Sequence, residues 1–86
     1  MRLSTAKWRD VKRVFLTFGI AAVEGRSAGH RRKRHPMLVD GSGRKYPIPA
    51  RKESDDIYRV YIEAARRRFN LTPEYGISDE DFYSRF

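Results

Sequence analysis

The sequence predicts one α+β domain in which a helix, three strands and a second helix follow one another. Three observations lead to this prediction. Apolar residues recur at helical spacing in residues 8–18 and again in 57–69. Between these stretches, short β-prone runs flank a glycine-rich turn. The length of 86 residues suits one hydrophobic core. We therefore expect a single domain over residues 1–86, with a core of about residues 4–71 and an acidic C-terminal extension, 72–86.

The first helix is expected to start after Ser4 or Thr5, because either side chain can accept a hydrogen bond from the first turn. Its inward stripe recurs every three or four residues and consists of Trp8, Val11, Phe15 and Phe18. Gly19 can adopt the left-handed conformation that ends a helix. Residues 20–23 then form a short apolar run, which predicts the first strand.

The next two strands are predicted as a hairpin. Residues 37–39 and 44–48 are β-prone, and the sequence Asp-Gly-Ser-Gly at 40–43 is typical of a tight turn. Pro47 and Pro49 lack amide donors, so the last strand is expected at an edge of the sheet.

Ser54 is the predicted N-cap of the second helix, and Asn70 is its predicted left-handed C-cap. The broad apolar side of this helix consists of Ile57, Tyr58, Tyr61, Ile62, Ala65 and Phe69. Residues 77–86 resemble a short amphipathic turn or helix. The expected architecture is a three-stranded antiparallel sheet with both main helices on one face.

Positive charge is concentrated in the middle of the chain. The whole sequence has 19 Lys and Arg against 11 Asp and Glu, a net charge of +8. Residues 26–52 hold nine bases and one acid, Asp40. Such a cluster favours a polyanionic partner, nucleic acid above all. The predicted phosphate-binding residues are Arg26, Arg31, Arg32, Lys33, Arg34, Arg44, Lys45, Arg51 and Lys52.

Other classes of protein are disfavoured by composition. The sequence has no Cys, which excludes disulfides and fits a reducing, cytoplasmic environment. Its apolar runs are too short to span a membrane, and its first residues do not resemble a signal peptide. The two histidines have no further ligands at metal-binding spacing, so we expect no metal and no cofactor.

Five stretches, in order, resemble one known family. They are residues 7–20, ending in Phe-Gly-Ile; 28–30, Ala-Gly-His; 34–36, Arg-His-Pro; 46–49, Tyr-Pro-Ile-Pro; and 57–71. Together they resemble the HicA-type toxins of bacterial toxin–antitoxin pairs. The resemblance implies a double-stranded-RNA-binding-like α-β-β-β-α fold. It also implies a metal-independent mRNA endoribonuclease and a partner similar to the HicB antitoxin.

The resemblance assigns the catalytic role to His30, which follows Ala28-Gly29 where the family has Gly-Ser. A histidine near neutral pKa can carry the proton that RNA cleavage moves, and neighbouring bases can stabilise the charged phosphorane. His35 lies five residues on, so the two rings would point to opposite faces of a regular strand. Alternatives remain at this stage. His30 can be an ordinary exposed histidine in a basic patch. The chain can be a non-catalytic RNA- or ribosome-binding module, or a DNA-binding accessory protein.

Overall fold

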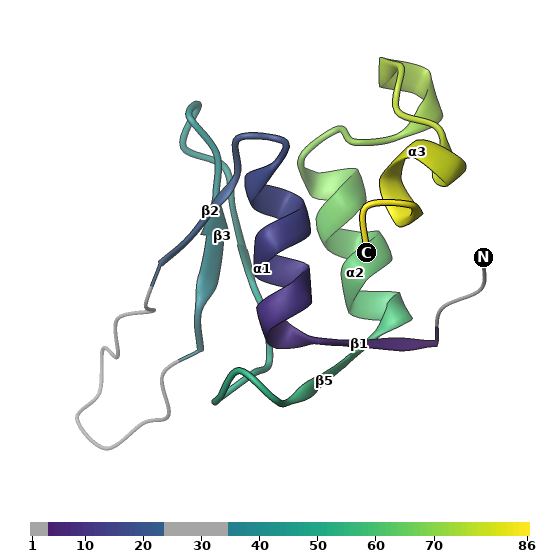
Figure 1. The fold of residues 1–86 in the computed structure, drawn as a ribbon. Helices are drawn as coiled ribbons and strands as arrows, with labels where there is room; N and C mark the ends of the chain where they lie inside the picture. Colours follow the sequence, from purple (N-terminus) through teal and green to yellow (C-terminus); the bar gives the residue numbers. More distant parts are fainter. Residues whose placement is uncertain (1–3, 24–34) are drawn as a thin grey trace.

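A computed structural model gives the fold, and it describes residues 4–23 and 35–86 (Figure 1). The chain is α+β, as predicted. In chain order the elements are β1 (Thr5–Lys7), α1 (Trp8–Leu16), β2 (Ala21–Val23), β3 (Met37–Val39), β4 (Lys45–Pro47), β5 (Asp56–Tyr58), α2 (Arg59–Arg68), the 3-10 helix η1 (Pro73–Tyr75) and α3 (Asp79–Tyr83). The strands β1 and β5 were not expected from the sequence.

The three predicted strands form one antiparallel sheet with the order β2-β3-β4. Leu38 lies at its centre, opposite Ala22 on one side and Tyr46 on the other. The hairpin turn is also as predicted. Gly43 has a φ of 95°, and Asp40 Oδ1 accepts hydrogen bonds from the turn, including one from Arg44 N at 2.9 Å. The positive φ explains why glycine stands at position 43.

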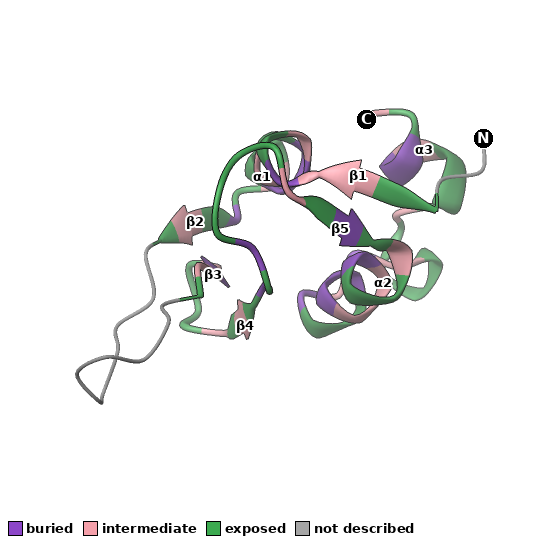
Figure 2. Cartoon of the chain, turned by 90° about the horizontal axis from the view of Figure 1, so that it is seen from below, coloured by how far each residue is buried: buried purple, intermediate pink, exposed green. Residues whose placement is uncertain are grey.

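Helices α1 and α2 lie on the same side of this sheet (Figure 1). Seen from below, β2 is next to α1, while β4 is on the side of α2 (Figure 2). The core between the helices and the sheet consists of Trp8, Val11, Val14, Phe15, Ile20, Leu38, Ile48, Ala50, Ile57, Ile62, Ala65, Phe69 and Leu71, with Phe82 and Tyr83 from the C-terminal segment. The predicted stripe of α1 therefore faces this core, although Phe18 is only partly buried.

The start of α1 differs from the prediction. Neither Ser4 nor Thr5 caps it; Thr5 belongs to β1, which pairs antiparallel with β5. The amide of Trp8 donates to Asp55 O at 2.8 Å, and the amide of Arg9 donates to Glu53 O at 3.1 Å. Backbone carbonyls of a distant segment thus satisfy the free amides of the first turn, so no side-chain cap is required.

The start of α2 differs for the same reason. Ser54 is not its N-cap, because the chain first forms β5 and the helix begins at Arg59. The amide of Arg59 donates to Ser4 O at 2.9 Å. Pairing of β1 with β5 therefore ties together the starts of both main helices.

Both helices end as predicted. Gly19 has a φ of 82° and Asn70 a φ of 60°. After each of them an amide reaches back five residues, from Ile20 N to Phe15 O at 3.0 Å and from Leu71 N to Arg66 O at 2.9 Å. This is the hydrogen-bond pattern of a Schellman motif.

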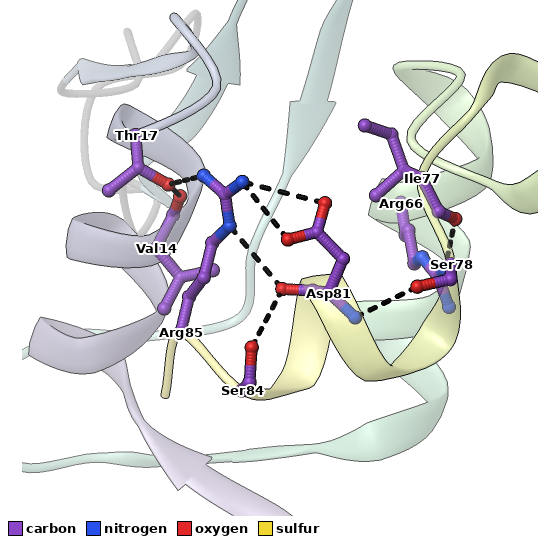
Figure 3. A network of polar contacts seen from close by, with 8 residues as sticks. All are labelled: Val14, Thr17, Arg66, Ile77, Ser78, Asp81, Ser84 and Arg85. Atoms are coloured by element: carbon purple, nitrogen blue, oxygen red, sulfur yellow. Dashed lines mark hydrogen bonds and ion pairs between the residues drawn. The ribbon is translucent and has the colours of Figure 1, made fainter.

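The C-terminal segment packs on the helices rather than trailing from them. Ser78 caps α3 by accepting from Asp81 N at 3.0 Å, and Phe82 is fully buried with its ring centroid 5.5 Å from that of Phe15. Arg85 bonds both Asp81 and Thr17, which joins the end of the chain to α1 (Figure 3).

Candidate nucleic-acid interface

The structure describes four of the nine bases predicted to bind phosphate: Arg44, Lys45, Arg51 and Lys52. The predicted catalytic His30 lies outside the described residues. So do the other five predicted bases, Arg26, Arg31, Arg32, Lys33 and Arg34.

Arg51 and Lys52 belong to the loop between β4 and β5, which Asp55 organises. Asp55 Oδ2 accepts the amides of Arg51 at 2.7 Å and Lys52 at 3.1 Å. These two hydrogen bonds lower the pKa of the Asp55 carboxyl, because they stabilise its ionised form. The carboxylate thus holds the loop backbone while both basic side chains are exposed, and neither forms an ion pair within the described part of the chain.

This loop contacts the start of α1, and residues of both segments line a hollow of about 330 Å³. Its walls include Lys12 from α1 and Arg51 and Lys52 from the loop, with Trp8, Ala22, Pro36 and Ala50 among the other lining residues. Among the described residues, Glu53 is the one carboxylate that lines it, and Glu53 is already paired with Lys12. We call the space that these residues line the first hollow.

A second hollow, of about 460 Å³, adjoins the first along α1. The two share Lys12, Ala22 and Glu53. The second hollow adds Arg9, Arg13, Leu16 and Ala21. The structure therefore brings two of the predicted bases, Arg51 and Lys52, next to bases of α1 that were not predicted to take part.

The sequence did contain a signal for the α1 bases. Arg9, Lys12 and Arg13 are spaced by three and four residues, off the apolar stripe, so they share the outward face of the helix. What the sequence could not supply is their neighbour. The loop carrying Arg51 and Lys52 is some forty residues away, and it reaches α1 through the backbone bonds to Trp8 and Arg9.

Arg44 and Lys45 lie elsewhere. Arg44 Nε pairs with Asp40 Oδ2 at 3.1 Å in the hairpin turn, and the carbonyl of Lys45 accepts from Arg68 Nε at 3.2 Å. The hairpin turn and the loop of residues 50–54 are at opposite ends of the sheet (Figure 1). The four described bases therefore do not form one cluster, and Arg44 is neutralised where it stands.

His35 is exposed and precedes Pro36, a lining residue of the first hollow. On the neighbouring strand Val23 is the register partner of Met37, and Ala22 lines the same hollow. The ends of the described chain at residues 23 and 35 are thus both next to the first hollow.

Within residues 4–23 and 35–86, no three His, Asp or Glu side chains lie together in a way that could hold a metal ion. No helix in the same two ranges has the length and apolar character needed to cross a membrane. Comparisons with protein-family models, curated proteins and solved structures found no match to this chain.

Proposed function

We propose that this chain binds RNA, and that the first hollow and its basic rim contribute to the RNA-binding surface. The observation that supports the proposal is the position of Arg51 and Lys52, neither of which forms an ion pair with a described residue, at a hollow where the one described carboxylate, Glu53, is already paired with Lys12. Cations that are held by a fixed backbone and not neutralised by neighbours are what phosphate recognition requires. Trp8 adds an aromatic wall, although most of its surface is buried.

The proposal extends to RNA cleavage on the basis of the HicA-type resemblance. In this chemistry the 2′-hydroxyl attacks the adjacent phosphorus, the bond to the 5′-oxygen breaks, and the products are a 2′,3′-cyclic phosphate and a free 5′-hydroxyl. One proton leaves the nucleophile and one reaches the leaving oxygen. His30 would carry one of these protons, as the family's histidine after Gly-Ser does. The bases of residues 26–34 would stabilise the phosphorane.

A protein antitoxin similar to HicB is the proposed partner, and it would act by covering the basic surface. Cleavage would then be prevented by exclusion of RNA. A non-catalytic RNA- or ribosome-binding role is the second candidate, because the cation arrangement described above supports binding and does not by itself require cleavage.

The test compares purified wild-type protein with His30→Ala on a labelled mRNA, with and without chelator, from about pH 6 to 8. Loss of a general acid or base is expected to slow cleavage about 10²–10⁴-fold. Binding should be almost unchanged, since the bases carry the attraction, and chelator should have no effect. His35→Ala is the matched control, because His35 is the other histidine of the chain and has no proposed proton-transfer role.

Two results would decide against parts of the proposal. Wild-type protein that binds RNA but never cuts it supports the non-catalytic role. Wild-type protein that fails to bind RNA at low salt removes both candidates.

A further inference from the structure

The second hollow has an apolar floor that the proposed RNA-binding surface does not use. Leu16, in the last turn of α1, is 62% exposed, and Ala21 and Ala22 of β2 line the same hollow. A large aliphatic side chain left open beside two alanines is the shape that a partner's apolar side chain can fill.

Cations line the same hollow. Arg9 has no ion pair within the described residues, whereas Lys12 is paired with Glu53. Arg13 is 3.5 Å from Asp10 and donates to the carbonyl of Arg85 at 2.9 Å, which fixes its position on α1. Arg9 is thus the cation of this hollow that has no ion pair among the described residues, and an occupant that places a carboxylate near it would meet complementary charge.

The wall formed by Ala21 and Ala22 belongs to an edge strand. β2 is the outermost strand in the order β2-β3-β4, and within the described residues no strand pairs with its other edge. An edge strand offers backbone donors and acceptors to an added chain, which is how extended peptides often bind. Figure 2 shows β2 at the side of the sheet next to α1.

From these three features we infer that the second hollow is a docking site for an extended segment of a partner protein, in which acidic and aliphatic side chains alternate. The segment lies along β2. One aliphatic side chain enters between Leu16 and Ala21, and a flanking carboxylate meets Arg9. The site stands independently of RNA binding; only its use to exclude RNA from the neighbouring first hollow rests on the proposed function.

The lining chemistry favours a peptide over RNA at this position. Among the described residues, every apolar side chain that lines the second hollow is aliphatic, so none of them offers an aromatic ring on which a base could stack. Trp8 lines the first hollow and not the second. A partner segment with Leu, Ile or Val next to Asp or Glu would place an aliphatic side chain against Leu16 and a carboxylate near Arg9.

The experiment selects short displayed peptides on the intact wild-type protein from two libraries. Both alternate aliphatic residues with charged ones; in one library the charges are Asp and Glu, in the other Lys and Arg. The best acidic peptide is then labelled and its affinity measured for wild type and variants. Leu16→Ser removes the exposed aliphatic side chain from the second hollow. Ala21→Leu fills the hollow with a larger side chain, and Arg9→Ala removes the cation that lacks an ion pair. Val60→Ser is the matched control, because Val60 is 65% exposed on α2, away from the site.

The acidic library is expected to yield binders and the basic library none. Affinity should fall about tenfold in Leu16→Ser and in Ala21→Leu, which is the size expected for loss of one buried aliphatic contact. Arg9→Ala should weaken binding severalfold, more at low salt than at high salt, and Val60→Ser should bind like wild type. Backbone amides of Ala21–Val23 should exchange more slowly when the peptide is bound.

Four results would overturn the inference: no enrichment from the acidic library, equal enrichment from the basic one, peptide affinity unaffected by Leu16→Ser, or unchanged exchange at β2. Self-association of the protein that Leu16→Ser abolishes would assign the hollow to a second copy instead. RNA binding that Leu16→Ser weakens as strongly as loss of Arg51 would assign it to RNA. Peptide binding by a protein that does not bind RNA would uphold this site and remove the proposed function alone.

Discussion

Arg66 Nη1 lies 2.8 Å from Asp79 Oδ1, so an ion pair joins α2 to the first residue of α3. The two partners differ in environment, since the Arg66 side chain is 2% exposed and that of Asp79 is 71% exposed. Arg66 also donates to the carbonyls of Leu71 and Ile77, and its guanidinium lies 4.8 Å from the ring centroid of Phe82. The buried Arg66 side chain thus binds three points of the segment that follows α2, at Leu71, Ile77 and Asp79.

Replacing Arg66 with Ala should therefore destabilise the fold by about 2–4 kcal/mol, because the buried carbonyl of Leu71 and the part-buried carbonyl of Ile77 lose their donor. Urea unfolding would measure the change in the free energy of unfolding. Arg67→Ala is the control: it removes the same kind of residue one position along, where the side chain is exposed, and should change stability by less than about 0.5 kcal/mol. Equal stability of the two variants would show that Arg66 does not anchor the C-terminal segment.

Phe15 and Leu16 form a second adjacent pair with opposite environments. Phe15 is fully buried, with its ring edge-on to Phe69 and Phe82 at centroid distances of 6.3 and 5.5 Å, whereas Leu16 is exposed. Phe15→Ala should cost roughly 3–5 kcal/mol, and Leu16→Ala less than about 1 kcal/mol. For a domain whose total stability is about 5–10 kcal/mol, the first change can unfold a large fraction at room temperature. A wild-type melting temperature for Phe15→Ala would contradict the assignment of the core.

Tyr83 should make stability depend on pH in the alkaline range. Burial, and then the hydrogen bond that its hydroxyl donates to Glu63, raise the pKa of Tyr83 from 10.0 to about 12. The folded state thus binds the proton more tightly than the unfolded state does. The stabilisation is fully present below pH 10 and is lost as the pH rises to about 12. A titration of tyrosinate absorbance should show one late step, near pH 12.

Tyr83→Phe is the control for this titration. It should remove the late step, because the hydroxyl that titrates there is gone. A late step that persists in Tyr83→Phe would mean that another tyrosine causes it.

Much of the fold was predictable because its signals are local. The stripe of α1, the Asp-Gly-Ser-Gly turn and the left-handed caps at Gly19 and Asn70 each depend on residues within a few positions of one another. The starts of the helices were predicted wrongly because their partners are distant. Ser4 and Ser54 are good caps by type, but pairing of β1 with β5 supplies backbone carbonyls instead. Nothing in either three-residue strand reveals its partner.

The candidate site was likewise predictable from local signals and not in its long-range contacts. The high charge of residues 26–52 is evident from composition, but composition does not show that Asp40 neutralises Arg44 or that Arg51 and Lys52 meet α1. Both facts depend on contacts made through the turn and through the loop around Asp55. In the fold, the hairpin turn beside Arg44 lies far from the loop with Arg51 and Lys52, although the two are close in sequence (Figure 1). That loop instead lies next to the bases of α1, which are some forty residues away in sequence.

Arg51 and Lys52 line the first hollow, whereas Arg44 and Lys45 do not. This difference gives a prediction for RNA binding that a count of charges alone does not give. If about five bases contact phosphates of duplex RNA, the logarithm of the binding constant should fall with the logarithm of salt concentration with a slope of about −4. Replacing Arg51 and Lys52 together with Ala removes two of the proposed contacts, so the slope should become shallower by about 2. Titration of a labelled RNA at several salt concentrations, for wild type and variant, measures both slopes.

The matched control is Arg44→Ala with Lys45→Ala, which removes the same number of charges from the same predicted cluster. Arg44 is already paired with Asp40, and neither Arg44 nor Lys45 lines the first hollow. The hairpin turn next to them is at the opposite end of the sheet from the loop of residues 50–54 (Figure 1). If the RNA lies across the hollow, the control should keep the wild-type slope, although its affinity falls slightly through the lower net charge. Equal changes in both double variants would mean that RNA responds to overall charge and not to this surface. A slope near zero for the wild type would exclude phosphate contacts as the basis of binding, because each such contact must release counterions.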